Sequence, residues 1–334
     1  MSSESQDFKM LKDPGWISPR FSDVIMRSFC SRLGFASAIY LFEYVFIPRP
    51  AAPMTTVPSS YGQKHPVETE QKISDALQQL KDEIDGMPEE TKENWLKAKK
   101  RCRPNLVDDR HLLLFLRCEV FNVDLAAGRL VRYWDKRVLV FGEDRAFLPL
   151  TLDGALKGDE TSLEMAFIQS TEHTDTEGRR LILGDPSKLD KTKYTRESML
   201  RAFWYTMHAA LEDEATQKRG IILLLFPHHA QFSQFDRKLV AANAESMKGC
   251  LPVRIGAFHI CHPPTFFTIV FPIIKLLLGK RLRERIKVHT GSEEHVLERL
   301  AGFGIPKESV PSDLGGAVVL NQKAWLESRR EIGL

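Results

Sequence analysis

The sequence predicts an α/β fold preceded by a helical lobe, and three patterns support this prediction. Apolar residues recur at helical spacing through much of residues 67–137. From residue 166 onward, short apolar strands alternate with amphipathic helices, which is typical of an α/β sandwich. Residues 220–226 are apolar almost throughout, as expected for a central strand of a sheet that is covered on both faces. The 334 residues suffice for one large and one smaller domain.

The helical lobe is expected to begin at residue 67 with a helix that ends at Gly86 and Pro88. A second helix is predicted over residues 90–101. Asp108 and Asn122 each stand immediately before an apolar helical run, so we expect both to cap helices. Structural packing is the expected role of this lobe.

The predicted α/β part follows a loop rich in Gly, Asp and Pro. Its strands are expected at residues 166–169, 181–183, 220–226 and 257–261. Its helices are expected at residues 194–214, 232–247 and 266–278.

Residues 266–278, here called the gate segment, are apolar over most of the helical circumference. Thirteen residues of helix span about 20 Å, which is too short to cross a bilayer unaided. The segment therefore packs against protein, lies on a membrane, or does each in turn. Pro272 lies inside it and is expected to bend the helix, with a hinge as the alternative.

A basic stretch follows the gate segment. Residues 275–289 contain six Lys or Arg against a single acid, Glu284. Leu278, Leu282 and Ile286 predict that helical structure continues, with Arg281 and Arg285 sharing another face. An apolar helix next to a basic amphipathic turn suits an anionic lipid surface. The alternative is a core helix whose basic end is simply solvated and favours the helix dipole.

Several ordered motifs between residues 108 and 316 resemble the CRAL-TRIO lipid-binding family, which includes cellular retinaldehyde-binding protein, α-tocopherol transfer protein and fungal phosphatidylinositol/phosphatidylcholine transfer proteins. The motifs are Leu-Pro-Val-Arg-Ile-Gly at 251–256, His-Pro-Pro at 262–264, the Phe-rich gate segment, Arg-Ile-Lys at 285–287, Ile-Pro-Lys-Glu-Ser-Val-Pro at 305–311 and Leu-Gly-Gly at 314–316. The resemblance implies an internal pocket for one lipid, with a β-sheet floor and a movable gate helix.

The resemblance also implies two sets of site residues. The pocket and gate are expected to be formed by Leu223, Leu225, Phe258, Ile260, Phe266, Phe267, Val270, Ile274 and Leu277. A basic patch that contacts phosphoinositide or another anionic membrane lipid is expected to be formed by Arg254, Arg281, Arg283, Arg285 and Lys287.

Departures from the family pattern narrow the range of lipids that we expect as ligands. Phosphatidylinositol-exchanging members carry Glu where this chain has Val253, and that Glu helps to hold the inositol phosphate headgroup. An often acidic strand position is Phe226 here, and the usual Gly three residues later is His229. Phosphatidylinositol is therefore a doubtful ligand, although Arg285 keeps the cation of the headgroup site.

The expected function is to bind one hydrophobic lipid and to exchange it between membranes. The alternative is a lipid-occupancy sensor that regulates a trafficking or lipid-kinase partner without net transfer. An enzyme is not expected, because the sequence lacks the Gly-x-Ser-x-Gly, phosphate-loop and His-Glu-x-x-His motifs. His259 and His262 are not expected to converge, so neither a metal nor another cofactor is predicted besides the bound lipid.

Composition sets the expected environment. The net charge of +3 is too small to favour nucleic-acid binding, and the five cysteines form no Cys-x-x-Cys pair, which favours a reducing compartment. We expect a cytoplasmic monomer with peripheral membrane association.

Four segments are expected along the chain. They are an N-terminal extension and Pro-rich linker (1–64), the helical lobe (65–145), the lipid-binding domain (146–316) and a C-terminal tail (317–334). Acidic residues before the apolar run at 35–47 argue against a signal or transit peptide. That run is either a membrane-contacting helix or a loosely packed extension.

Overall fold

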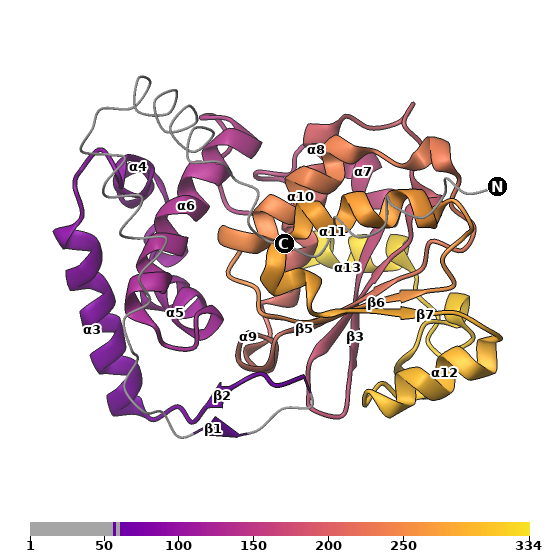
Figure 1. Ribbon diagram of the computed structural model, residues 1–334. Helices are drawn as coiled ribbons and strands as arrows, with labels where there is room; N and C mark the ends of the chain where they lie inside the picture. Colours follow the sequence, from indigo (N-terminus) through magenta and orange to yellow (C-terminus); the bar gives the residue numbers. More distant parts are fainter. Residues whose placement is uncertain (1–55, 58–60) are drawn as a thin grey trace, which may run out of the picture. The chain divides into compact units, whose positions relative to one another are not determined.

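The computed structural model describes residues 56–57 and 61–334 (Figure 1). The apolar run at residues 35–47 lies outside the described residues. Strand β1 (Thr56–Val57) pairs antiparallel with β2 (His65–Pro66), so the Pro-rich stretch contains a short two-stranded sheet. The described residues belong to one compact unit.

The helical lobe contains the helices that the apolar periodicity predicts, drawn from indigo to magenta in Figure 1. They are α3 (Glu70–Gly86), α4 (Glu93–Arg101), α5 (Asp109–Cys118) and α6 (Val123–Phe141). The predicted caps are confirmed, because the side chain of Asp108 accepts from the backbone of α5 and that of Asn122 accepts from the backbone of α6. Apolar side chains from these helices form one buried core with α8 (Arg196–Ala210) and α10 (Arg237–Gly249).

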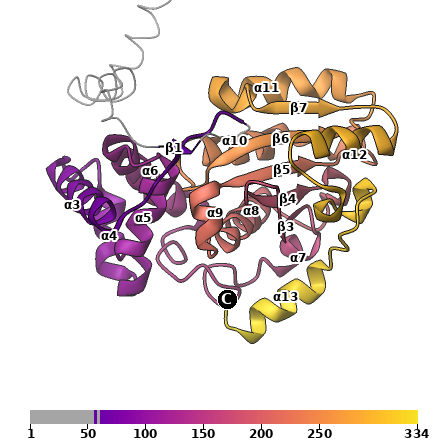
Figure 2. The ribbon, with the colours of Figure 1, turned by 90° about the horizontal axis from the view of Figure 1, so that it is seen from below.

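A five-stranded sheet forms the centre of the α/β part. Its strands are β3 (Ile168–Thr174), β4 (Arg180–Gly184), β5 (Ile221–Leu225), β6 (Ile255–Cys261) and β7 (Ile286–His289). They follow one another in the order β3-β4-β5-β6-β7, as Figure 2 shows. The β3–β4 pair is antiparallel and the other pairs are parallel. The apolar segment predicted to be central, β5, is the middle strand of this sheet.

Alternation along the strands separates two apolar layers. Leu223 of β5 and Phe258 of β6 belong to the core that includes α8 (Arg196–Ala210) and α10 (Arg237–Gly249). Ile222 and Leu224 belong to a second core with α12 (Glu293–Gly302). Helix α11 (Phe267–Arg283) packs against α10 and therefore lies on the first face. The remaining helices are α7 (Glu160–Glu164), α9 (Glu214–Arg219) and α13 (Gln322–Glu331).

Two predicted helices have other limits in the structure. The segment predicted as one helix over 194–214 forms two helices. Helix α8 ends at Ala210, and α9 begins at Glu214, where the side chain of Asp213 caps it. The helix predicted from residue 232 begins instead at Arg237, because Asp236 caps α10 and a 3₁₀ turn (Phe232–Gln234) precedes it.

The end of the gate helix differs from the prediction in two ways. Helix α11 ends at Arg283, and Ile286 starts β7, so Arg281 and Arg285 do not share one helical face. Pairing with β6 takes precedence over the helical spacing of Leu278, Leu282 and Ile286. The backbone of α11 also leaves helical geometry at Gly279, with φ 71° and ψ 172°, a break that was not predicted, while the bend expected at Pro272 stays a prediction.

Candidate functional site

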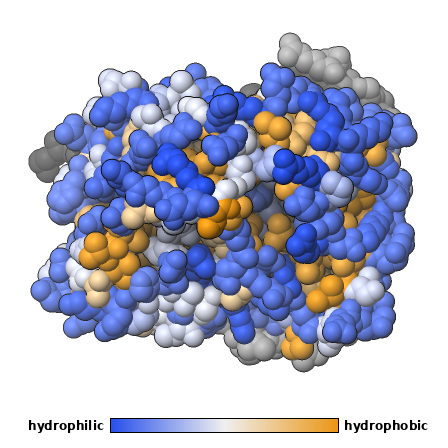
Figure 3. All heavy atoms as spheres, turned by 180° about the vertical axis from the view of Figure 1, so that it is seen from behind, coloured by the Kyte–Doolittle hydropathy of each residue, from blue (hydrophilic) through white to orange (hydrophobic). Residues whose placement is uncertain are grey.

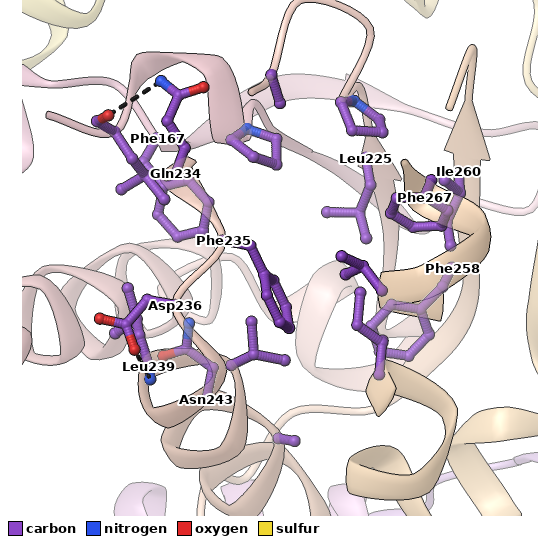
Figure 4. A pocket seen from close by; sticks show the side chains of 18 of the residues that line it. Phe167, Leu225, Gln234, Phe235, Asp236, Leu239, Asn243, Phe258, Ile260 and Phe267 are labelled. Atoms are coloured by element: carbon purple, nitrogen blue, oxygen red, sulfur yellow. Dashed lines mark hydrogen bonds between the residues drawn. The ribbon is translucent and has the colours of Figure 1, made fainter. Parts of the chain in front are cut away.

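An apolar cavity of about 160 Å³ lies between the sheet and helices α10 and α11 (Figure 4). The sheet supplies its floor through Leu223 and Leu225 of β5 and through Phe258 and Ile260 of β6. Parallel strands covered on both faces are apolar on both sides, so this floor follows directly from the sequence of β5 and β6.

The structure places most of the predicted pocket residues on this cavity. The lining includes Leu223, Leu225, Phe258, Ile260, Phe266, Phe267, Val270 and Ile274. Leu277 packs at the edge of the helical core, while its neighbour Leu278 lines the cavity. Phe266 comes just before the first residue of α11, and its ring lies 5.9 Å from that of Phe232 between centroids.

The wall that α10 contributes to the cavity was not predicted from the sequence. Leu239, Asn243 and Met247 are four residues apart, so they share one helical face, and all three line the cavity. Phe167, Phe203 and Phe235 add aromatic side chains. The spacing along α10 identifies an inward face, but no local signal tells whether that face meets a core or a hollow.

Polar side chains are few in this lining, and most of them have partners. Gln234 donates through Nε2 to the carbonyls of Ser187 and Leu189. Asp236 caps α10 and pairs with Arg196 at 2.7 Å. Asn243 differs: it is 8% exposed, and its Oδ1 has no hydrogen-bond partner among the described residues. A buried acceptor without a partner costs about 1–3 kcal/mol.

The apolar cavity is small. Sites for drug-sized ligands have volumes of roughly 300–1,000 Å³, so 160 Å³ is small for a lipid. Helix α11 is joined to the strands on either side by a Pro263–Pro264 turn and by the short turn before β7.

A second pocket, of about 350 Å³, lies beside the first and is cationic. Its lining contains seven basic side chains, Lys64, Arg129, Lys248, Arg254, Lys280, Arg281 and Arg285. Glu119 lies nearby, paired with Arg129 at 2.5 Å and with Arg281 at 3.7 Å. The local balance is therefore strongly positive, which favours an anionic ligand. We call this space the cationic pocket.

Arg254 is the most buried cation of the predicted patch, at 7% exposed. Its guanidinium donates to the carbonyls of Lys218 at 2.6 Å and Lys64 at 2.5 Å. Burial lowers the pKa of Arg254 to about 10, and the cations of Arg285 and Arg281 act in the same direction. The side chain remains charged at neutral pH, with carbonyl oxygens but no carboxylate paired with it within residues 61–334.

The other predicted basic residues are divided between two places. Arg285 lines the cationic pocket and donates to the carbonyl of Ile255, and burial lowers its pKa. Arg281 lines the same pocket with a largely exposed side chain. Arg283 is exposed outside the lining, and Lys287 lies over the ring of Phe303, with 5.9 Å from Nζ to the centroid. Val253 is buried in the lining of the cationic pocket.

The outer face of α11 carries apolar side chains that no other described element covers. Ile269 is 63% exposed and Leu276 is 71% exposed. Seven residues separate them, which places both on one helical face. By contrast, the side of the molecule opposite to Figure 1 is mostly hydrophilic, with apolar residues in separate patches (Figure 3). Among the described helices, none is long and apolar enough to span a membrane.

Two pairs of histidines lie close together at the sheet. His228 and His262 lie at the sheet end before α11, with ring centroids 5.6 Å apart. His259 and His289 are fully buried on the other face of the sheet and share a 2.8 Å hydrogen bond. No set of three His, Cys, Asp or Glu within the described part of the chain could hold a metal ion.

Comparison with known proteins agrees with this architecture. Residues 164–316 match the model of the CRAL/TRIO domain. Clavesin-1 of Xenopus laevis is 26% identical over 218 residues, which cover 63% of this chain and 61% of that protein. The alpha-tocopherol transfer protein-like protein of Homo sapiens is 27% identical over 232 residues, which cover 66% of this chain and 64% of that protein. The match thus spans less than two thirds of either relative's length.

Among solved structures, Sfh5 aligns with a TM-score of 0.49 at 12% identity. The alignment covers 80% of this chain and 99% of Sfh5.

Proposed function

We propose that this chain binds one hydrophobic lipid in the apolar cavity and exchanges it between membranes, and the match of residues 164–316 to the CRAL/TRIO domain supports this proposal. The observation that carries the proposal is the apolar cavity between the sheet and α11. One of the similar proteins is named for tocopherol transfer, which accords with a lipid cargo. In this proposal the protein performs no catalytic step and requires no resident cofactor.

The energetics of the gate couple release to a membrane. Opening α11 in water would expose on the order of 300–400 Å² of apolar side chain, at a cost of about 8–10 kcal/mol at 25 cal/mol/Å². Opening against a bilayer costs far less, because the exposed side chains then meet hydrocarbon. This difference holds the gate segment closed in the cytoplasm and permits exchange at the membrane.

Docking in this proposal uses two surfaces of the same region. Ile269 and Leu276 would enter the apolar boundary of the bilayer, while Arg281, Arg283 and the cationic pocket attract anionic headgroups such as phosphoinositides. Each cation near an anionic leaflet contributes about 1 kcal/mol, so a few give a reversible attachment. The protein then acts as a monomeric peripheral protein.

A transfer assay between two vesicle populations tests the proposal. Donor vesicles carry a fluorescent hydrophobic lipid with a quencher, and acceptor vesicles carry neither. We expect the purified chain to extract the lipid and to raise its rate of appearance in acceptor vesicles. Extraction without net transfer would instead support the lipid-occupancy sensor, and the absence of both would contradict lipid binding.

A further inference from the structure

The wall that α10 contributes to the apolar cavity is interrupted by one amide. Leu239 and Met247 lie one turn to either side of Asn243 on the same helical face, and all three line the cavity. Figure 4 shows Asn243 on this wall beside Leu239. An apolar side chain at this position would continue the stripe, so the amide is a departure that packing alone does not explain.

The neighbouring polar residues in the lining form no hydrogen bond with the side-chain oxygen of Asn243. The carboxylate of Asp236 is engaged by Arg196 and by the first backbone amides of α10. The amide of Gln234 is engaged by the carbonyls of Ser187 and Leu189 and by the backbone of Gln231. Asn243 is more than nine-tenths buried, and within the described residues its Oδ1 has no partner.

We propose that Asn243 selects lipids that carry a hydroxyl group, which donates a hydrogen bond to Oδ1 of its side chain. The inference rests on the proposed function, because it assigns the class of ligand to the same cavity. An amide oxygen accepts and cannot donate, so a ligand that offers an O–H satisfies it. A ligand without a donor leaves the oxygen buried and unpaired, and that penalty discriminates between otherwise similar lipids.

The other lining residues limit what else the ligand can carry. The sheet side of the cavity, formed by Leu223, Leu225, Phe258 and Ile260, is apolar and offers no polar partner. The expected ligand is therefore an alcohol whose remaining surface is hydrocarbon, with its hydroxyl group directed at the middle of α10.

Two isomers provide a sharp test. Heptadecan-1-ol and hexadecyl methyl ether have the same atoms, but only the alcohol can donate a hydrogen bond. Full-length chain freed of lipid is incubated with phosphatidylcholine vesicles that contain both in equal amounts, and the lipid recovered with the protein is quantified by mass spectrometry. From wild type to Asn243→Leu, we expect the ratio of bound alcohol to bound ether to fall at least about tenfold.

Lys238→Leu is the control, because it also introduces a leucine on α10, at an exposed position that lines neither pocket. It should change the ratio less than about twofold. Circular dichroism and thermal unfolding verify that both variants fold. A ratio that Asn243→Leu leaves unchanged, or that Lys238→Leu lowers equally, overturns the assignment to Asn243 while lipid binding stands. Binding of neither isomer by the wild type overturns lipid binding together with the assignment.

Discussion

His259 and His289 are buried side by side in the sheet, and both rings are neutral at pH 7 because burial lowers their pKa values to about 3 and about 4. Tyr61 donates its hydroxyl proton to the carbonyl of Phe303 at 3.1 Å. Nε2–H of His259 must therefore donate to the Tyr61 oxygen, at 3.1 Å, which leaves Nδ1 of His259 to accept from Nε2–H of His289. Nδ1 of His289 then carries no proton and can only accept, in agreement with its lack of a hydrogen-bond partner in residues 61–334.

This chain of neutral groups predicts acid sensitivity. Burial lowers the pKa of both histidines, and the proximity of His289 lowers that of His259 further. The unfolded chain therefore binds protons first, so the free energy of unfolding is highest above about pH 7 and falls as the pH drops below about 6.5. Each histidine contributes up to about 1.4 kcal/mol per pH unit.

Urea unfolding at pH 7, 6 and 5 checks this dependence. The double variant His259→Leu and His289→Leu should show a flatter decline of the unfolding free energy than the wild type. Parallel declines for the two proteins would rule out these histidines as its source.

Gly279 carries the break in α11, and its backbone is in a region that side chains with a Cβ avoid. A Cβ there would meet Cδ of Lys248 at 3.4 Å, so there is space for a methyl group. Backbone strain is therefore the main cost of an alanine at this position. We expect Gly279→Ala to lower the free energy of unfolding by about 1–3 kcal/mol.

Gly86→Ala at the end of α3 is the control, because Gly86 has open space and no positive φ. It should be neutral or slightly stabilising in the same denaturant titration. Equal effects of the two substitutions would mean that the conformation of Gly279 is not costly to an alanine.

At the scale of the element, α11 combines an apolar half with a basic end, and its charges can be tested apart from its fold. Arg281 and Arg283 have exposed side chains, whereas Arg285 also holds the carbonyl of Ile255. We expect Arg281→Gln with Arg283→Gln to weaken binding to anionic vesicles by about 2 kcal/mol, or roughly thirtyfold, in vesicle sedimentation at low salt.

Lys99→Gln with Lys100→Gln makes the same change of net charge on the exposed surface of α4. This pair should bind vesicles nearly as the wild type does. If both pairs weaken binding equally, net charge and not the end of α11 attracts the protein to the membrane.

The elements show what local sequence can and cannot predict. The apolar run of β5 was predictable, because burial on both faces of the sheet leaves a continuous apolar pattern. The gate segment was predictable as a helix from the spacing of its apolar residues, although Ile269 and Leu276 are exposed. The start of β7 was not, because Ile286 fits the helical spacing of Leu282 and only pairing with β6 places it in a strand. Arg254 and Arg281 meet in one pocket through the fold, and no spacing in the chain indicates that proximity.

The cavity itself is a property of the whole molecule. Eight of the nine expected pocket residues line it, since strand alternation and the gate helix set their direction. The contribution of α10 could not be foreseen, because Leu239 and Met247 have the pattern of ordinary core residues. Hollow and solid interiors use the same apolar side chains and differ only in how completely those side chains fill the space.

For the molecule as a whole, occupancy should raise stability. A ligand that binds only the folded chain stabilises it by about 2.7 kcal/mol at a concentration one hundred times its dissociation constant. We expect protein stripped of lipid to melt at a lower temperature and to recover when an apolar lipid is restored from vesicles. Scanning calorimetry with and without the lipid measures the shift, and identical melting curves would contradict binding in the interior.

Met247 and Leu278 line both the apolar cavity and the cationic pocket, so these two side chains separate the two spaces. Both are unbranched at Cβ and can change rotamer. Rotation of both side chains would join the two spaces into a single compartment with an apolar end and a cationic end. The length and head charge of the molecules that this protein can accommodate would then depend on two side chains, neither of which carries a charge.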